Sequence, residues 1–134
     1  MSTSEFAAFF ANRVLAANAY ASGDFAPLEG MLAHSGAATF HSPRGDTVNG
    51  AGAVARRYRE DAESFAPGGD SKLEVMQMGD SGDLAFWTGY QLATVRPKGA
   101  GDATQMRIRV TEVFGRAADG WRLIHRHADT ARQP

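Results

Sequence analysis

The chain has 134 residues, no cysteine, 14 basic and 15 acidic residues, and a formal net charge of −1. This length suits one domain with a single core, and the balanced charge disfavours nucleic acid as a partner. The lack of cysteine excludes disulfides and thiolate chemistry, and no apolar run approaches the roughly 20 residues that a membrane span needs. Because no basic segment precedes the first apolar residues, we expect a cytoplasmic protein. The excess of arginine over lysine and the abundance of alanine indicate a GC-rich bacterial genome.

Three helices are predicted in the first half of the chain. Apolar residues recur at helical spacing over residues 2–22, where Ser2 or Ser4 can cap the start. A short second helix is expected after Asp24, which can cap it. The third helix is predicted over residues 50–65, and a segment of alanine, proline, two glycines and aspartate should end it in a loop.

Five runs of residues are predicted to be strands. They are residues 37–42, before the third helix, and residues 72–78, 84–95, 103–116 and 121–129, after it. The last four runs alternate apolar and polar residues and are joined by short turns, so we expect an antiparallel meander. Helices that precede most of the strands predict an α+β fold instead of alternating strands and helices.

The last predicted hairpin carries the most informative polar residues. Side chains alternate across a strand, which puts Glu112 on an apolar face of the first run. The same alternation puts His125 and His127 on the apolar face of the second run, beside Trp121 and Leu123. A carboxylate and two imidazoles on an apolar surface indicate a pocket. Four arginines are predicted on the opposite face, in a dimer interface or a solvated surface: Arg107, Arg109, Arg122 and Arg126.

Short motifs accompany this order of elements. They are Ser22-Gly23-Asp24 between the first two helices, Gly50 at the start of the third, residues 81–85, residues 109–113, and residues 119–127 with the ending Gly-Trp-x-x-x-His-x-His. Over nearly the whole chain, this layout resembles the nuclear transport factor 2-like superfamily, and within it a SnoaL-like or DUF4440-type domain. The resemblance implies a cone-like, strongly curved, mostly antiparallel sheet packed on three N-terminal helices, with a pocket in the cone. It also implies a homodimer formed through the sheet, and we expect a single domain over residues 1–134.

The catalytic residues of two known branches of the superfamily are not reproduced. The resemblance to ketosteroid isomerase-like members puts Ser42, before Pro43, at the place of their aspartate base, and Ala16 at the place of their tyrosine oxyanion donor. The pocket arginines of the calmodulin-dependent kinase association domain correspond to Gln91 and Glu112, so we expect no anion pocket of that kind. Superfamily members include isomerases, cyclases, dehydratases and transport factors, and the fold therefore does not fix the function.

Glu112 and His127 are the candidate catalytic residues. Burial of a lone carboxylate raises its pKa and can prepare it for general acid or base catalysis. On the predicted face, Glu112 would neighbour His125 or His127 across the hairpin. The alternative is a structural hydrogen bond or ion pair between Glu112 and a histidine or arginine. The candidate ligand-binding residues, for which core packing is the alternative, are Tyr58, Trp87, Gln91, His125 and His41.

No metal and no cofactor are predicted. His125 and His127, with Glu112 or Asp129, could form part of a facial metal site, but a well-placed third histidine would have to be His41. We therefore predict a domain that binds a small, largely apolar organic molecule and has no nucleic-acid or membrane partner. Cofactor-independent acid/base chemistry of the isomerase, cyclase or dehydratase type is one interpretation. A non-catalytic module for ligand sensing or oligomerisation is the other, and the sequence leaves the choice open.

Overall fold

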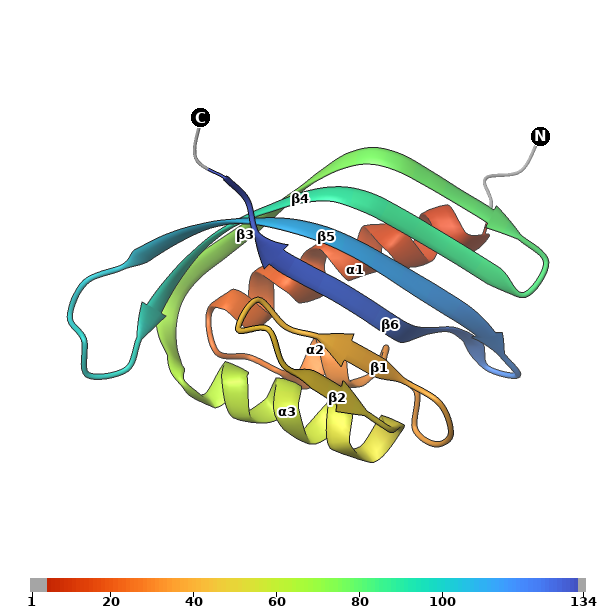
Figure 1. Cartoon of the computed structure of the whole chain (residues 1–134), viewed down its shortest axis with the longest axis horizontal. Helices are drawn as coiled ribbons and strands as arrows, with labels where there is room; N and C mark the ends of the chain where they lie inside the picture. Colours follow the sequence, from red (N-terminus) through yellow and green to blue (C-terminus); the bar gives the residue numbers. More distant parts are fainter. Residues whose placement is uncertain (1–4, 133–134) are drawn as a thin grey trace.

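The computed structural model describes residues 5–132, in which three helices lie on one side of a curved sheet (Figure 1). The helices are α1 (Glu5–Ala21), α2 (Ala26–Glu29) and α3 (Ala51–Glu63). They confirm the three predicted helices. The predicted caps Ser2 and Ser4 lie outside the described residues.

The turn between α1 and α2 shows why the sequence needs glycine there. Gly23 has a φ of 90°, and a Cβ at this position would lie 2.6 Å from the backbone oxygen of Phe65. Any other residue would therefore strain the backbone and collide with the backbone at Phe65. Asp24 accepts a hydrogen bond from the backbone N–H of Ala26 at 3.1 Å, which holds the chain at the beginning of α2.

Over the described residues, the sheet has six strands in the order β2-β1-β6-β5-β4-β3. Their bounds are β1 (Thr39–His41), β2 (Thr47–Asn49), β3 (Phe65–Ser81), β4 (Leu84–Pro97), β5 (Thr104–Ala117) and β6 (Gly120–Thr130). Neighbours run antiparallel except β1 and β6, which run parallel. The α+β fold, the four-stranded meander and the curved, mostly antiparallel sheet are thus confirmed. Strand β2 was not predicted from the sequence, because three residues are too few to show an alternating pattern.

One predicted loop is wrong. Residues 66–70 belong to the first part of β3: Ala66 and Asp70 pair with β4, and the register shifts between them. Pro67 has no N–H for the ladder and Gly68 has a φ of 103°, and both lie inside that irregular part. These residues therefore distort the strand without ending it.

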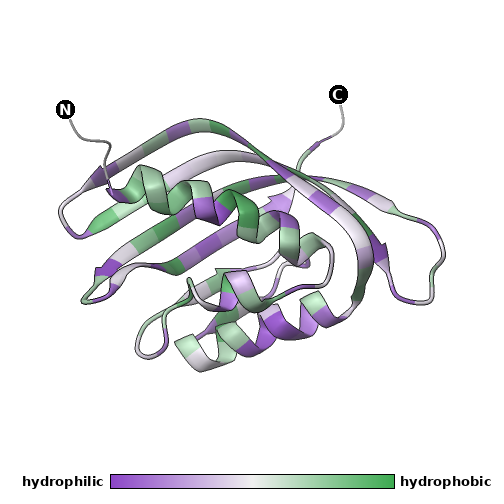
Figure 2. Ribbon diagram, turned by 180° about the vertical axis from the view of Figure 1, so that it is seen from behind, coloured by the Kyte–Doolittle hydropathy of each residue, from purple (hydrophilic) through white to green (hydrophobic). Residues whose placement is uncertain are grey.

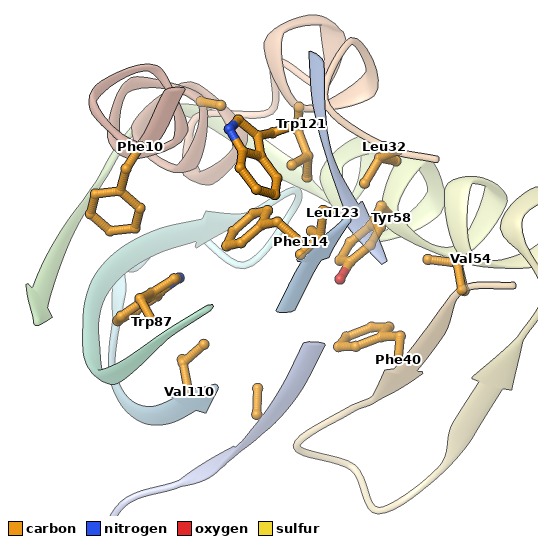
Figure 3. Packing of buried hydrophobic residues seen from close by; sticks show 14 of the residues in the cluster. Phe10, Leu32, Phe40, Val54, Tyr58, Trp87, Val110, Phe114, Trp121 and Leu123 are labelled. Carbon is orange, nitrogen blue, oxygen red and sulfur yellow. The ribbon is translucent and has the colours of Figure 1, made fainter. Parts of the chain in front are cut away.

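Aromatic side chains fill one end of the concave face. Phe6 of α1 lies 5.2 Å from Phe114 and 5.5 Å from Trp121, measured between ring centroids. Phe10 contacts Trp87 edge to face at 5.7 Å (Figure 3). Apolar residues line α1 and alternate with polar residues along the strands, as Figure 2 shows. This packing closes one end of the concave side, so that open space is left toward the C-terminal half of α1 and toward α3.

Candidate functional site

A β-bulge in β6 decides which residues face the interior. The register pairs Val113 with His125 but Phe114 with Leu123, which leaves Ile124 without a partner. One extra residue in a strand reverses the alternation of side chains beyond it. The residues of β6 after Ile124 therefore face the opposite side from the one that simple alternation predicts.

The bulge overturns three placements made from the sequence. Trp121 is buried before the bulge, but Arg126 and Ala128 are the buried residues after it, with Arg126 only 8% exposed. His125 and His127 turn to the convex face instead. The prediction that both histidines share a face with Glu112 is wrong, and so is the prediction that Arg126 lies on the outer face.

Glu112 lies at the centre of a buried cluster of charges. Its side chain is 0% exposed, and its Oε1 accepts hydrogen bonds from Arg13 Nε at 3.0 Å and from Trp87 Nε1 at 2.7 Å. Its Oε2 accepts from Arg13 Nη2 at 2.7 Å and from Arg126 Nη1 at 2.8 Å. The predicted contact with a histidine is therefore wrong. The alternative, an ion pair with arginine, is confirmed.

The arginines determine the protonation of this carboxylate. Burial by itself raises the pKa of Glu112, but the charges of Arg13 and Arg126, with the hydrogen bonds from Arg13 and Trp87, outweigh burial and hold the pKa at about 2. The expected raised pKa is wrong, because the carboxylate is not alone. A general acid or base role for Glu112, which depended on that raised pKa, loses its physical support.

The cluster continues from Arg126 into β4. Arg126 Nη2 donates to Gln91 Oε1 at 2.7 Å, and Gln91 Nε2 donates to Ser71 Oγ at 3.0 Å. Each terminal nitrogen of Arg126 therefore has a hydrogen-bond partner. Three buried donors differ: within residues 5–132, Arg13 Nη1, the hydroxyl of Tyr58 and Trp121 Nε1 have no hydrogen-bond partner.

A cavity of about 250 Å³ is lined by Arg13 and Tyr58, which carry two of these three donors, but not by Trp121. Its buried polar lining consists of Arg13, Ser42, Tyr58, Gln91 and Arg126. Apolar residues from several elements supply most of the remaining wall, among them Ala17, Leu28, Phe40, Val95, Met106 and Ile108. Tyr58 stacks on Phe40 with ring centroids 4.8 Å apart, which fixes the position of the phenol ring (Figure 3). The site is thus an apolar chamber with a polar, positively charged floor.

The remaining charged residues of the lining belong to an ion-pair network around α3. Arg57 donates to Asp46 at 2.6 Å and to Asp61 at 3.1 Å, and its guanidinium lies 5.6 Å from the centre of the Phe40 ring. The side chain of Arg44 is 75% exposed and lies 3.6 Å from Asp61. Hydrogen bonds from Arg57 and Ser42 hold the pKa of Asp46 at about 2. These residues keep each other in place through charge, in contrast to the unpartnered donors of the floor.

The predicted ligand-binding residues divide into two groups. Tyr58 and Gln91 line the cavity. Trp87 is not among the lining residues; it is 0% exposed and donates to Glu112. His41 and His125 do not line it either, since their rings contact each other on the convex side with centroids 5.3 Å apart.

The histidines form a cluster of their own at the junction of β1 and β6. The ring of His41 lies 5.0 Å from that of His127, and His125 Nδ1 lies 2.6 Å from the hydroxyl of Thr39. Burial, followed by the charges of His41 and His127, lowers the pKa of His125. Over the described part of the chain, no three His, Asp or Glu side chains are arranged to hold a metal ion.

Sequence reasoning missed Arg13 and Arg126 as lining residues. Arg13 carried a signal, because it stands at helical spacing with Phe6, Phe10 and Ala17 on the apolar stripe of α1. A charged residue in such a stripe must be paired or functional. Arg126 carried no signal, because its orientation depends on the bulge at Ile124.

Comparison with known proteins places this geometry in a wider group. A family model described as a SnoaL-like domain matches residues 12–131. No curated protein matches the chain significantly in sequence. Within the described residues, no helix has both the length and the apolar character that crossing a membrane requires.

Several solved structures share the fold. A candidate dehydratase of the NTF2-like family from Streptomyces avermitilis is 21% identical, with 93% of this chain and 94% of that chain covered and a TM-score of 0.74. An NTF2-like superfamily protein from Salmonella enterica is 17% identical, with 96% and 90% covered and a TM-score of 0.79. The CaMKII hub of S. rosetta is 20% identical, with 98% and 100% covered and a TM-score of 0.69. At these identities the similarity shows the fold alone.

Proposed function

The chain belongs to the SnoaL-like domain family, and from that premise we propose that it binds a small, largely apolar organic molecule in the cavity of its curved sheet. One observation carries the proposal: two buried donors, Arg13 Nη1 and the Tyr58 hydroxyl, belong to residues that line this cavity and have no partner within the described residues. A buried donor without an acceptor costs roughly 1–3 kcal/mol, and more when it is charged. A ligand that accepts both hydrogen bonds would remove this cost.

The size and composition of the cavity support a small ligand. Pockets for drug-sized molecules usually measure about 300–1,000 Å³ and combine apolar walls with a few well-placed polar groups. At about 250 Å³, this cavity has the same composition and suits a smaller molecule. The stacked Phe40 and Tyr58 rings give it one flat aromatic wall.

The chemistry of the lining favours binding over proton transfer. Glu112 and His127, the candidate catalytic residues, are not among the lining residues. Tyr58 has its pKa raised by burial and stays protonated, and Asp61 is engaged by two arginines. We therefore propose a ligand-binding module as the main function. Isomerase, cyclase or dehydratase activity would need a proton carrier supplied by the substrate or by a change of conformation.

A second copy of the chain on the convex face is our proposal for the protein partner. Met76 is 70% exposed and Phe86 37% exposed on β3 and β4, and Tyr90 packs under Arg107 at 4.0 Å on the same sheet. Large apolar side chains on an exposed sheet are typical of protein interfaces. The fold shared with the CaMKII hub agrees with this proposal. Cytoplasmic location stays a prediction from the composition.

A cavity-filling substitution tests the binding proposal. We expect a ligand-observed NMR screen of small organic molecules to find compounds that bind the wild-type protein and are lost from Ala17→Leu, because Ala17 is buried in the cavity wall. The matched control is Ala11→Leu, which adds the same atoms to an exposed position of α1. Compounds that bind both variants equally, or a screen without any binder, would refute the proposal.

A further inference from the structure

The buried cluster under the cavity has an excess of one positive charge. Among the described residues, the buried charged side chains are Arg13, Arg126 and Glu112, which are two cations and one anion. The pKa of Arg13 is raised, and arginine side chains in general are not deprotonated in proteins. Removing a charge from water is costly unless an opposite charge compensates it, and one carboxylate cannot compensate two guanidinium groups.

The hydrogen bonds show where the missing charge belongs. Glu112 takes the Nε and Nη2 hydrogens of Arg13 and the Nη1 hydrogen of Arg126, and Gln91 takes Nη2 of Arg126. Arg13 Nη1 is left over, and so is the hydroxyl of Tyr58, which burial keeps protonated and able to donate. Both residues line the same cavity. The excess charge and two of the free donors therefore belong to residues that line one cavity.

We propose that the ligand of this cavity is an organic monocarboxylate, whose carboxylate accepts hydrogen bonds from Arg13 Nη1 and the Tyr58 hydroxyl while its hydrocarbon part fills the apolar chamber. This inference rests on the proposed function. A carboxylate has one negative charge and two oxygens, which match an excess of one positive charge and two donors. Binding would turn the Arg–Glu–Arg cluster into a neutral group of two arginines and two carboxylates.

Other classes of ligand match less well. A phosphate monoester carries a charge of about −1.5 to −2 and three acceptor oxygens, so it would bring uncompensated charge and unpaired acceptors into an apolar chamber. An alcohol, amide or ketone could accept hydrogen bonds but would leave the excess charge in place. A cation would face four arginines against one carboxylate among the described lining residues: Arg13, Arg44, Arg57 and Arg126 against Asp61.

The walls of the chamber suit the rest of such a molecule. The apolar side chains of Leu28, Val95 and Ile108 come from α2, β4 and β5 and line the same cavity as Arg13 and Tyr58. The aromatic face of Phe40 adds a flat surface beside Tyr58. A short alkyl chain or a single aromatic ring therefore fits the shape and the polarity.

Matched acids and amides test the inference by isothermal titration calorimetry. The probes are hexanoate, benzoate and 3-phenylpropanoate, each compared with its primary amide, and hexyl phosphate. We expect at least one acid to bind at least about tenfold more tightly than its amide, because hydrogen bonds to charged groups contribute about 1.5–3 kcal/mol each. Hexyl phosphate should bind more weakly than hexanoate.

Tyr58→Phe is the sharpest variant, because it removes the hydroxyl and keeps the ring. Since this hydroxyl has no partner in the free protein, the variant should fold and keep or gain stability against urea. Its affinity for the acid should fall at least about fivefold, while its affinity for the amide falls less. Tyr90→Phe, on the convex sheet face, is the control and should change neither affinity.

The outcomes separate this inference from the proposed function. An acid that prevails over its amide in the wild type and loses that advantage in Tyr58→Phe supports both. Amides that bind as tightly as their acids, or a preference for hexyl phosphate, would keep the cavity as a binding site and overturn the carboxylate. Acids and amides that all fail to bind, while the NMR screen finds other cavity ligands, would also overturn the carboxylate alone. Failure of the probes and of the screen together would reject both proposals.

Discussion

The two faces of the sheet hold their charged residues in opposite ways. On the concave face, Glu112 is 0% exposed and is shared by two arginines. On the convex face, Arg109 and Asp129 form one pair at 2.6 Å, with side chains 63% and 40% exposed. Buried ion pairs combine large opposing energies, whereas exposed pairs contribute little. Arg–carboxylate pairs of similar geometry should therefore contribute differently to stability on the two faces of the sheet.

Loss of the buried carboxylate should have the largest effect. We expect Glu112→Gln to lower the free energy of unfolding by about 3–5 kcal/mol, because it leaves two buried guanidinium groups without an anion. Urea denaturation followed by tryptophan fluorescence measures this loss. Full stability in the variant together with lost activity would instead support the catalytic role predicted from the sequence. A loss below about 1 kcal/mol would show that the cluster is compensated in another way.

The sequence predicted the frame of the molecule well, because the frame depends on periodicity and turns. The three helices, the meander and the inward face of Glu112 all follow from the spacing of apolar residues. Tyr58 and Gln91 reach the cavity for the same reason, since each lies in a regular stretch whose buried face could be identified. In a regular helix or strand, the spacing of apolar residues indicates directly which side chains are buried.

The site was harder to predict, because one unpaired residue changed it. Ile124 is an ordinary strand residue, and its side chain gives no indication of a bulge. By reversing the alternation, it exchanges His125 and His127 for Arg126 on the interior side. A predicted carboxylate–histidine pair thereby becomes a carboxylate–arginine cluster. The pKa of Glu112 changes direction as a consequence, and with it the chemistry that the residue can perform.

Acid should destabilise the wild-type protein through the same buried cluster, by somewhat less than the substitution Glu112→Gln does. The pKa of Glu112 falls from its ordinary 4.5 to about 2 in the folded state, because the two arginines outweigh burial. A lowered carboxyl pKa gives stability that is complete above about pH 4.5 and is lost as the pH falls from there through about 2. At about 1.4 kcal/mol per pKa unit, the loss attributable to Glu112 is about 3 kcal/mol.

Parallel titrations isolate this contribution. Urea denaturation between pH 7 and pH 2 should show the wild type losing stability more steeply than Glu112→Gln, so that the two curves approach each other at acid pH. Asp129→Asn serves as the reference, because it leaves the buried cluster intact and should follow the steep wild-type curve. Wild-type and Glu112→Gln curves that stay parallel over the acid range would contradict the lowered pKa of Glu112.

The smallest effect is expected from the exposed pair. Asp129→Asn should lower stability much less than Glu112→Gln, because water already solvates Arg109 and Asp129. Hydrogen bonds from Arg109 lower the pKa of Asp129, yet the interaction is open to solvent, and salt at about 1 M shortens the screening length to about 3 Å. The difference between wild type and Asp129→Asn should therefore shrink in salt, whereas the effect of Glu112→Gln should persist. A large, salt-resistant loss in Asp129→Asn would break the comparison of the two faces. If that loss also grew with protein concentration, it would mean that a second copy covers the convex sheet and buries the pair.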